Sequence, residues 1–320
     1  MPQQNWATAA DGGRLGTTHL TKMLRQAAQP LLRFRQLVEP FPEGIGKGRG
    51  DTLLFNKVGN VATAGGSLAE TSTIPATKAA IQQGSVVMTE FGNSVPFTSK
   101  LSTLSEYDVE AMVKQVLAND MAKTLETQAG GQHTSGKIKA VCTSTTSTVF
   151  TSDGTFTATA SANAGRANVM DIVDDMRRRN TPPFDAQGNY LCVATVNFLR
   201  GVRADLESFM QYTESGVEGL KGSGLYPYRG EVGRFYDCRF VLVNHFLKNT
   251  VGSGANKGEA VFIGADAVRE YAAIPEEMRT KIPTDFGRDE GMAWYYLGNF
   301  VRVWDQTNDS EDHLVHVGSA

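Results

Sequence analysis

The residues of this chain that could carry out chemistry are five histidines, three cysteines and a few clusters of carboxylates. His245 follows the apolar stretch VLVN, and polar residues placed just after a buried strand are common in α/β active sites. No GxSxG nucleophile motif accompanies this histidine. We therefore expect His245 to be structural, and a hydrolase that uses His245 is the less favoured alternative.

A second candidate lies near the C-terminus. His313 and His316 stand three residues apart, beside Asp309, Glu311 and Asp312. Imidazole and carboxylate groups are ligands that Zn²⁺ accepts. The stretch also has the composition of a short acidic tail, and we expect an exposed tail without a metal.

The remaining chemical motifs favour structural explanations. Asp171, Asp174 and Asp175 precede three arginines at 177–179 in the order that suits ion pairs on a solvated helix face. GKGRG at 46–50 lacks the GxxxxGK[ST] spacing of a phosphate-binding loop and is expected to be a linker. The cysteines are far apart in sequence, which predicts reduced thiols and neither a zinc site nor a disulfide framework.

The overall composition argues against a protein that binds nucleic acid through its net charge. The 320 residues include 31 basic and 34 acidic side chains, for a formal charge of -3. The first 50 residues are basic, with seven positive and three negative side chains. We expect them to clamp an acidic neighbouring subunit, and a contact with DNA is the alternative. No stretch approaches the roughly 18 apolar residues of a membrane span or matches an export signal, so a soluble, cytoplasmic protein is expected.

The N-terminal part of the chain is predicted to be extended. Residues 1–50 form a polar arm with one possible helix at 18–28, and the apolar side chains that follow must dock on another surface. Strand patterns at 51–60 and 86–101 bracket about two dozen small or polar residues, far more than the roughly 2 to 6 of an ordinary connection. This arrangement predicts a hairpin that projects from the body.

Helical periodicity follows. Apolar spacing predicts a long helix over 104–128, with Ser105 as its cap and Gly130 as its stop. The Thr/Ser-rich stretch at 132–165 alternates like β-strands and is interpreted as a hairpin insertion that turns at Asp153.

The C-terminal half is predicted to be a mixed lobe followed by strands. Helix patterns begin at 168 and 198 and flank a buried strand, and a glycine-spaced loop precedes a second buried strand at 238–246. Residues 259–273 are expected as a strand and a short helix, and residues 292–305 as an apolar strand.

Several stretches carry a resemblance to a known family. TEFGNSVPFT at 89–98 leads into LSEYD at 104–108, KIPTDFGR at 281–288 runs into GMAWYYLG at 291–298, and GEVGR at 230–234 is a weaker match. In this order the stretches resemble the major capsid proteins of short-tailed phages of the N-four type, which share the Hong Kong 97 coat fold. None of them is a catalytic signature.

The resemblance implies an α+β chain with a Hong Kong 97-like capsid fold. It implies five parts, namely an N-terminal arm (1–50), an extended loop (51–103), a spine helix and peripheral domain with the Thr/Ser-rich insertion (104–164), an axial domain (165–257) and C-terminal peripheral-domain strands (258–320).

It further implies a structural protein and not an enzyme, without cofactor or metal. The expected function is self-assembly through pentamers and hexamers into an icosahedral virion shell around double-stranded phage DNA, which is held without sequence specificity. A separate scaffolding protein, a portal and a possible decoration protein would be further partners, and assembly would take place in the host cytoplasm. An encapsulin-like nanocompartment shell around protein cargo is the alternative.

The expected contacts between subunits are non-covalent and involve the arm and the loop strands. Apolar side chains there would contribute ~25 cal/mol per Å² when a neighbour covers them. The candidate contact residues are Arg33, Phe34, Arg35, Leu53, Phe55, Phe91 and Phe97.

Overall fold

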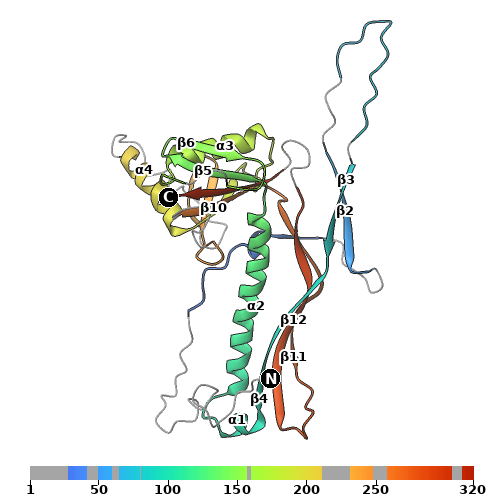
Figure 1. The fold of residues 1–320 in the computed structure, drawn as a ribbon, viewed down its shortest axis with the longest axis vertical. Coiled ribbons are helices and arrows are strands. Elements are labelled where there is room, and N and C mark those ends of the chain that lie inside the picture. Colours follow the sequence, from blue (N-terminus) through green and yellow to red (C-terminus); the bar gives the residue numbers. More distant parts are fainter. Residues whose placement is uncertain are drawn as a thin grey trace.

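The computed structural model describes residues 28–41, 50–59, 65–79, 81–156, 160–210, 231–247, 258–304 and 312–320. The possible helix at 18–28 and the linker at 46–50 lie outside these residues, apart from the last residue of each. Figure 1 shows a lobe at the upper left, a long helix below it, a narrow sheet beside that helix and a hairpin that projects on the far side.

The long helix α2 spans Val109–Thr134 and begins at Asp108, whose carboxylate accepts a hydrogen bond from the Ala111 amide at 3.0 Å. Ser105, the expected cap, instead ends the short helix α1 (Ser99–Leu104). The helix also continues through Gly130, where a Cβ would lie 2.7 Å from the ring of Phe246. The predicted helix was therefore shifted by more than a turn at each end, because the glycine makes room for a neighbouring ring and does not end the helix.

The cap of α2 gives a stability prediction. Replacing Asp108 with Ala leaves the Ala111 amide without its acceptor, and we expect a loss of about 0.5–2 kcal/mol in the free energy of unfolding. Asp108→Asn keeps a capping oxygen and should lose much less. Urea unfolding of both variants checks this, and equal losses would contradict the assignment of the cap.

A narrow four-stranded sheet runs alongside α2 in the order β1-β11-β12-β4. Its strands are β1 (Glu39–Pro40), β4 (Thr89–Thr98), β11 (Val268–Thr280) and β12 (Asp289–Arg302). Asp120 of α2 accepts hydrogen bonds from the indole of Trp294 at 3.0 Å and from the Asn93 amide at 2.9 Å. These two bonds join the helix to the middle of the sheet.

The structure corrects the short helix expected near residue 270. Val268 and Tyr271 are three residues apart, which suits a helix, but both belong to strand β11 and are buried. Antiparallel pairing with β12, interrupted by register shifts around Ile274, holds this segment extended. Long-range strand pairing therefore outweighs the local spacing.

The lobe contains a seven-stranded sheet in the order β6-β5-β13-β10-β7-β9-β8. Its strands are β5 (Ile138–Ser144), β6 (Ser147–Thr151), β7 (Tyr190–Ala194), β8 (Glu231–Phe235), β9 (Cys238–Leu242), β10 (Gly258–Ile263) and β13 (Leu314–Ser319). Helices α3 (Arg166–Arg178) and α4 (Val196–Met210) pack on one face, over alternate residues such as Cys192 and Phe262. The residues that alternate with these, such as Leu191 and Val261, point to the other face of the sheet and belong to the core around α2.

Three expectations about the lobe differ from the structure. Strand β5 pairs with β13 inside the sheet, so the stretch at 132–165 contributes strands to the lobe, and its hairpin turns between Ser144 and Ser147 and not at Asp153. Strands β10 and β13 also lie in this sheet, so residues 258–320 do not all join the four-stranded sheet. Residues 231–235, expected in a loop, form β8. Each of these strands pairs with a partner distant in sequence or is too short to show a pattern of its own.

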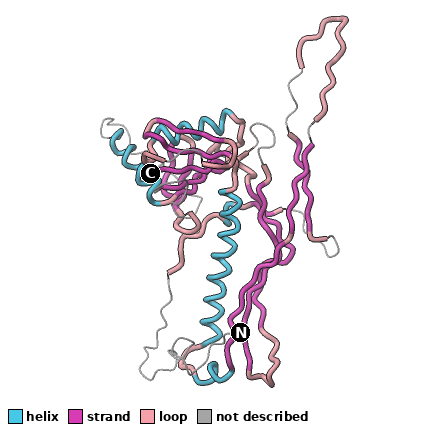
Figure 2. Tube along the Cα trace, viewed as in Figure 1, coloured by secondary structure: helices cyan, strands magenta, loops and turns pink. Residues whose placement is uncertain are grey.

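The sequence predicted a projecting hairpin, and the structure contains one, but its second strand is Ile81–Val87 and not the predicted 86–101, most of which forms β4 of the narrow sheet. Strands β2 (Thr52–Val58) and β3 (Ile81–Val87) pair antiparallel, from Thr52 opposite Val87 to Val58 opposite Ile81. Residues 65–79 continue beyond the paired strands in an extended excursion, which Figure 2 shows as the pink loop at the top of the view. None of the helices within the described residues is long and apolar enough to cross a membrane.

Candidate assembly surfaces

Residues 28–41 form a strap that runs across the body of the molecule. The Leu31 amide donates to Asn244 Oδ1 of the lobe at 2.5 Å. The strap then crosses α2 and adds the short strand β1 to the edge of β11. At its end the ring of Phe41 lies 5.6 Å from Phe55 of the hairpin. The strap therefore touches the lobe, the helix, the narrow sheet and the hairpin in turn.

Glu126 of α2 is the anchor of the strap. Its carboxylate is buried and accepts three backbone N–H bonds, from Arg33 at 2.5 Å, Phe34 at 2.7 Å and Arg35 at 3.1 Å. Phe34 is fully buried beside the ring of His133. A carboxylate that satisfies three consecutive amides fixes the direction of the strap as well as its position.

Arg35 ties the strap to the narrow sheet. Its guanidinium contacts Glu270 at 3.0 Å and Glu276 at 2.7 Å, and Glu270 also accepts the hydroxyl of Tyr296 at 2.9 Å. Burial alone would lower the pKa of Arg35, but the hydrogen bond to Glu276 and the charge of Glu270 outweigh it and raise that pKa. The hydrogen bond from Arg35 in turn lowers the pKa of Glu276. The contact is therefore a stable ion pair at neutral pH.

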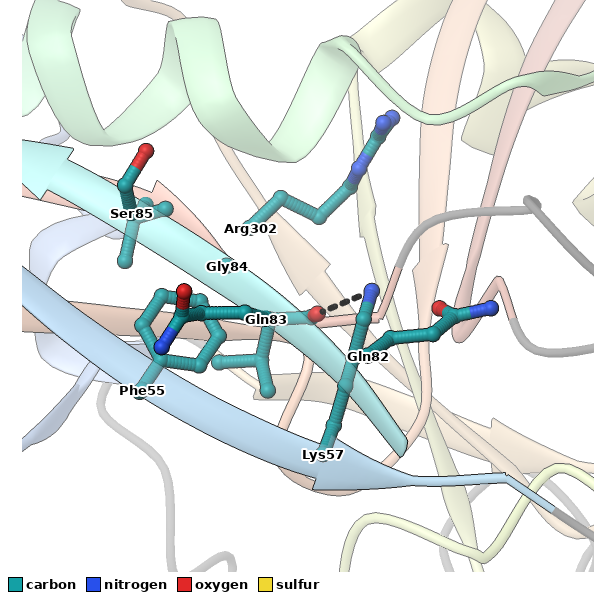
Figure 3. A pocket seen from close by; sticks show the side chains of 9 residues that line it. Phe55, Lys57, Gln82, Gln83, Gly84, Ser85 and Arg302 are labelled. Atoms are coloured by element: carbon teal, nitrogen blue, oxygen red, sulfur yellow. Dashed lines mark hydrogen bonds between the residues drawn. The ribbon is translucent and has the colours of Figure 1, made fainter. Parts of the chain in front are cut away.

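The base of the hairpin is fixed to the body, as Figure 3 shows. Lys57 Nζ donates to the carbonyl oxygen of Val303 at 3.2 Å, and the lysine is buried. A hollow of about 530 Å³ lies between the hairpin and the end of β12, next to Phe55 and Arg302. Gly84 faces Phe55 so closely that a Cβ would lie 2.3 Å from its ring. The base is thus oriented by the body, while the rest of the hairpin extends outward.

The hairpin exposes apolar side chains along its length. Proteins that act as monomers seldom expose many such residues on one projecting element, and such surfaces usually bind another molecule. The exposed members are Leu54, Val58, Leu68, Ile74 and Ile81.

The turn between β11 and β12 exposes two further apolar residues on a rigid loop. Asp289 accepts from the Thr284 amide at 2.9 Å, from the Thr284 hydroxyl at 2.8 Å and from the Asp285 amide at 2.9 Å. The hydrogen bond from Lys281, followed by those from these groups, keeps the pKa of Asp289 well below its usual range. In this frame Ile282 is 83% exposed and Phe286 is entirely exposed, with a left-handed φ of 47° at Phe286.

The contact residues expected from the sequence divide into two groups. Phe34 and Phe97 are covered by their own chain, and Arg35 is paired within it. Leu53, Phe55, Phe91 and Arg33 are half-buried. The exposed residues of the hairpin and of the β11–β12 turn were not singled out, although KIPTDFGR drew attention to the turn as a motif.

The residues that the sequence offered as candidates for chemistry, namely His245, the cysteines and the Asp/Arg cluster, have structural contacts. The Thr127 hydroxyl donates to the Lys123 carbonyl at 2.8 Å, so the His245 ring, 3.3 Å away, donates to that hydroxyl and cannot activate it. All three cysteines are buried, and burial raises the pKa of Cys142 to about 12. Arg179 pairs with Asp175 on α3 at 2.7 Å, as expected for an ion-paired helix face.

The prediction of an exposed acidic tail is wrong for residues 312–320, which the structure describes. His313 and His316 belong to a buried stretch that ends in strand β13, and Asp312 is fully buried with its carboxylate accepting the Lys137 amide at 2.6 Å. Asp309 and Glu311 lie outside the described residues. No group of three or more histidine, cysteine or acidic side chains suited to a metal ion occurs among the residues that the structure describes.

Solved phage capsids share this architecture. The head protein of Helicobacter pylori bacteriophage KHP40 matches with a TM-score of 0.66 at 11% identity, covering 98% of each chain. The capsid of Ralstonia phage GP4 matches with a TM-score of 0.65 at 13% identity over 95% of each chain. The capsid of cyanophage P-SCSP1u gives 0.63 at 14% identity, covering 96% of this chain and 94% of that one. The chain thus has the Hong Kong 97-like coat fold, in which an extended loop, a long helix and two sheets make one subunit.

The sequence comparison assigns the family. Residues 12–193 match the phage capsid family, and the chain belongs to it. No curated protein matches the chain by sequence. The protein is a phage major capsid protein that forms the virion shell and is not an enzyme, as expected from the sequence. The N-four-type grouping stays a prediction.

Proposed function

We propose that this chain assembles through pentamers and hexamers into an icosahedral shell around double-stranded phage DNA, in the cytoplasm of the host. The observation that supports the proposal is the hairpin, which is fixed at its base and exposes apolar side chains along its length. A subunit with such an element is completed only by a neighbour that covers it. Repetition of the same contact by symmetry would close the shell.

The exposed fractions of the side chains indicate which residues we propose to contact a neighbouring subunit. The hairpin residues Leu54, Leu68 and Ile74 would lie on a neighbouring subunit, where burial contributes ~25 cal/mol per Å² of apolar area. Leu53, Phe55, Phe91 and Arg33 would add only their exposed edges. Phe34 and Phe97 would support the contact from within the chain by fixing the strap and β4.

The two sheets suggest that the subunit has two domains with different positions in the shell. We infer that the seven-stranded lobe, built from the described residues within 135–263 and from 312–320, is the axial domain that meets the symmetry axes. The narrow sheet and α2 would be the peripheral domain, with residues 1–50 as the arm and 51–88 as the extended loop. This division replaces the boundaries expected from the sequence, because β10 and β13 pair with β7 and β5.

A scaffolding protein, a portal and a possible decoration protein are the further partners we propose. The basic arm, described here from residue 28, clamps its own body through Glu126 and Glu270. The described part of the arm thus binds its own chain, and the choice between a clamp on a neighbouring subunit and a DNA contact rests on residues 1–27. Purified empty shells distinguish the two for residues 1–27, because deletion of these residues should impair assembly without DNA if they clamp and should leave empty shells intact if they bind DNA.

The β11–β12 turn gives a direct test of the proposed function. Phe286→Ser removes the most exposed aromatic ring in the described chain without touching the bonds of Asp289. We expect the fold to be unchanged and the yield of closed shells, counted by electron microscopy, to fall at least about tenfold. Burial of each ring against a neighbouring subunit would contribute about 1.5–3 kcal/mol to the free energy of association. Arg288→Ser, in the same turn, is the control. Equal yields for Phe286→Ser and the wild type would contradict a role of this turn in assembly.

A further inference from the structure

Three ionisable side chains form a buried row beneath the C-terminal end of α2. Lys139 of β5, His316 of β13 and Glu259 of β10 lie on the same face of three adjacent strands. Their exposed fractions are 5%, 6% and 5%, so none of them can contact a neighbouring subunit. Burial of three such groups is costly unless they are paired, and the assembly surfaces do not require them.

The row is one hydrogen-bonded chain. Lys139 Nζ donates to the Thr134 carbonyl, at the last residue of α2, at 2.6 Å and lies 3.3 Å from His316 Nδ1. His316 Nε2 lies 2.7 Å from Glu259 Oε1. The ammonium can only donate and the carboxylate can only accept, so both bonds form when the ring is neutral with its proton on Nε2.

The surroundings close the chain off from water. The ring of Phe156 packs edge-on against the ring of His316, with 5.1 Å between the ring centres, and Lys139 Nζ lies 5.5 Å from the centre of the Phe156 ring. Within the described residues, the other charged groups that act on Lys139 are Asp312, before β13, and Arg302, at the end of β12. His133 of α2 faces the other way, toward Phe34. The charge state of Lys139 therefore depends on Asp312 and Arg302 as well as on Glu259.

We propose that this row is a proton-operated latch, in which neutral His316 holds the last turn of α2 on the seven-stranded sheet and protonated His316 releases it. A second proton on the ring sits on Nδ1, beside the ammonium of Lys139 and near the Thr134 carbonyl that the ammonium uses. Two donors and two positive charges then face each other across 3.3 Å in a buried site. The ammonium must move away, and its bond to the Thr134 carbonyl is lost with it.

The pH range of the latch follows from the pKa values of His316 and Lys139. Burial lowers the pKa of His316 below 6.5, so the folded protein keeps the ring neutral while the unfolded chain takes up a proton. Stability from this group is thus complete above pH 6.5 and falls as the pH drops toward the folded pKa. Burial lowers the pKa of Lys139 to about 8, so its ammonium is present at pH 7 and below. The bonded row therefore exists near neutral pH and opens in acid.

Release of the latch would act on the junction between the two halves of the subunit. The last turn of α2 leads directly into β5, and α2 packs along β12 and β4 for the rest of its length. Loss of the Thr134 contact would leave the lobe free to change its angle to the helix. The latch goes beyond shell formation, because it couples the shape of each subunit to the pH around it.

The test compares amide hydrogen exchange in the full chain at pH 7.5 and pH 5.0. In the wild type, amides of residues 131–134 should exchange at least about tenfold faster at pH 5.0, after correction for the intrinsic effect of pH, as expected if the contact at Thr134 is lost. His316→Gln offers an oxygen to Lys139 and an N–H to Glu259 but cannot take up a proton. It should abolish the acid response, and His245→Gln should keep it.

Two results would overturn the latch: an acid response of equal size in His316→Gln, or no acid response in the wild type. If His316→Gln does not fold, exchange of the imidazole C2 hydrogen in the wild type gives the titration midpoint of His316. That midpoint must coincide with the midpoint of the amide response, and a mismatch would also overturn the latch. Shell formation is not part of the readout, so the proposed function can fail while the latch stands.

Discussion

Glu126→Gln is expected to release the strap from α2 and to lower the free energy of unfolding by about 2–4 kcal/mol. A glutamine amide has one acceptor oxygen and no charge, so at least one of the amides of Arg33, Phe34 and Arg35 loses its partner, and the others lose a charged acceptor. The strap also carries β1 and Phe41. Its release should therefore expose the edge of β11 and loosen the base of the hairpin.

Unfolding by urea measures the loss, and limited proteolysis locates it. Cleavage after Arg33 and Arg35 should become fast in Glu126→Gln and stay slow in the wild type. Glu110→Gln is the matched control, because Glu110 lies on the same helix but is exposed and, among the described residues, pairs only with Lys114. A strap that stays protected in Glu126→Gln would show that the carboxylate does not hold it.

Shortening the hairpin is expected to abolish closed shells while the subunit still folds. Val58 and Ile81 face each other in the last pair of the ladder, so residues 59–80 can be replaced by Asn-Gly in a two-residue turn that keeps the register. The variant retains Lys57, Phe55 and Gly84, which fix the base to the body. It loses Leu68 and Ile74, the exposed apolar residues of the excursion.

Sedimentation velocity and electron microscopy of the shortened chain give the answer. We expect folded subunits or small oligomers, and a fall in closed shells of more than about a hundredfold, since each subunit loses the contact that couples it to its neighbour. The double variant Leu68→Ser, Ile74→Ser keeps the length of the loop and should give an intermediate loss. Closed shells from the shortened chain at the wild-type yield would rule out the hairpin as the main contact.

Elements with strong local patterns could be predicted from the sequence. The apolar spacing of α2 and α3 and the runs of apolar residues in β7 and β12 are visible in short windows, and the hairpin was signalled by an unusually long polar connection. Strand β13 was missed because its pairing partners, β10 and β5, lie far away in the chain, and its histidines suggested an exposed tail. Strand β8 was missed because it is only five residues long and follows a glycine-spaced stretch. Long-range pairing decides such segments, and no local pattern reports it.

The exposure of side chains was predicted less well than the fold. Phe34 and Phe97 are aromatic residues on extended segments and were expected at a subunit interface, but their own core covers them. Glu126 lies on a helix rich in polar residues, where an acidic side chain suggests solvent, and only its three backbone partners reveal its role. The exposure of Phe286 depends on the bonds around Asp289, which sequence spacing does not show.

Electron cryomicroscopy of particles assembled from the expressed full-length chain tests the central claim most directly. The account predicts closed icosahedral shells in which residues 65–79 lie on an adjacent subunit, with Leu68 and Ile74 covered, while the strap stays on Glu126 of its own chain. Shells whose hairpins point into solvent, or a chain that stays monomeric at high concentration together with its scaffolding protein, would contradict it.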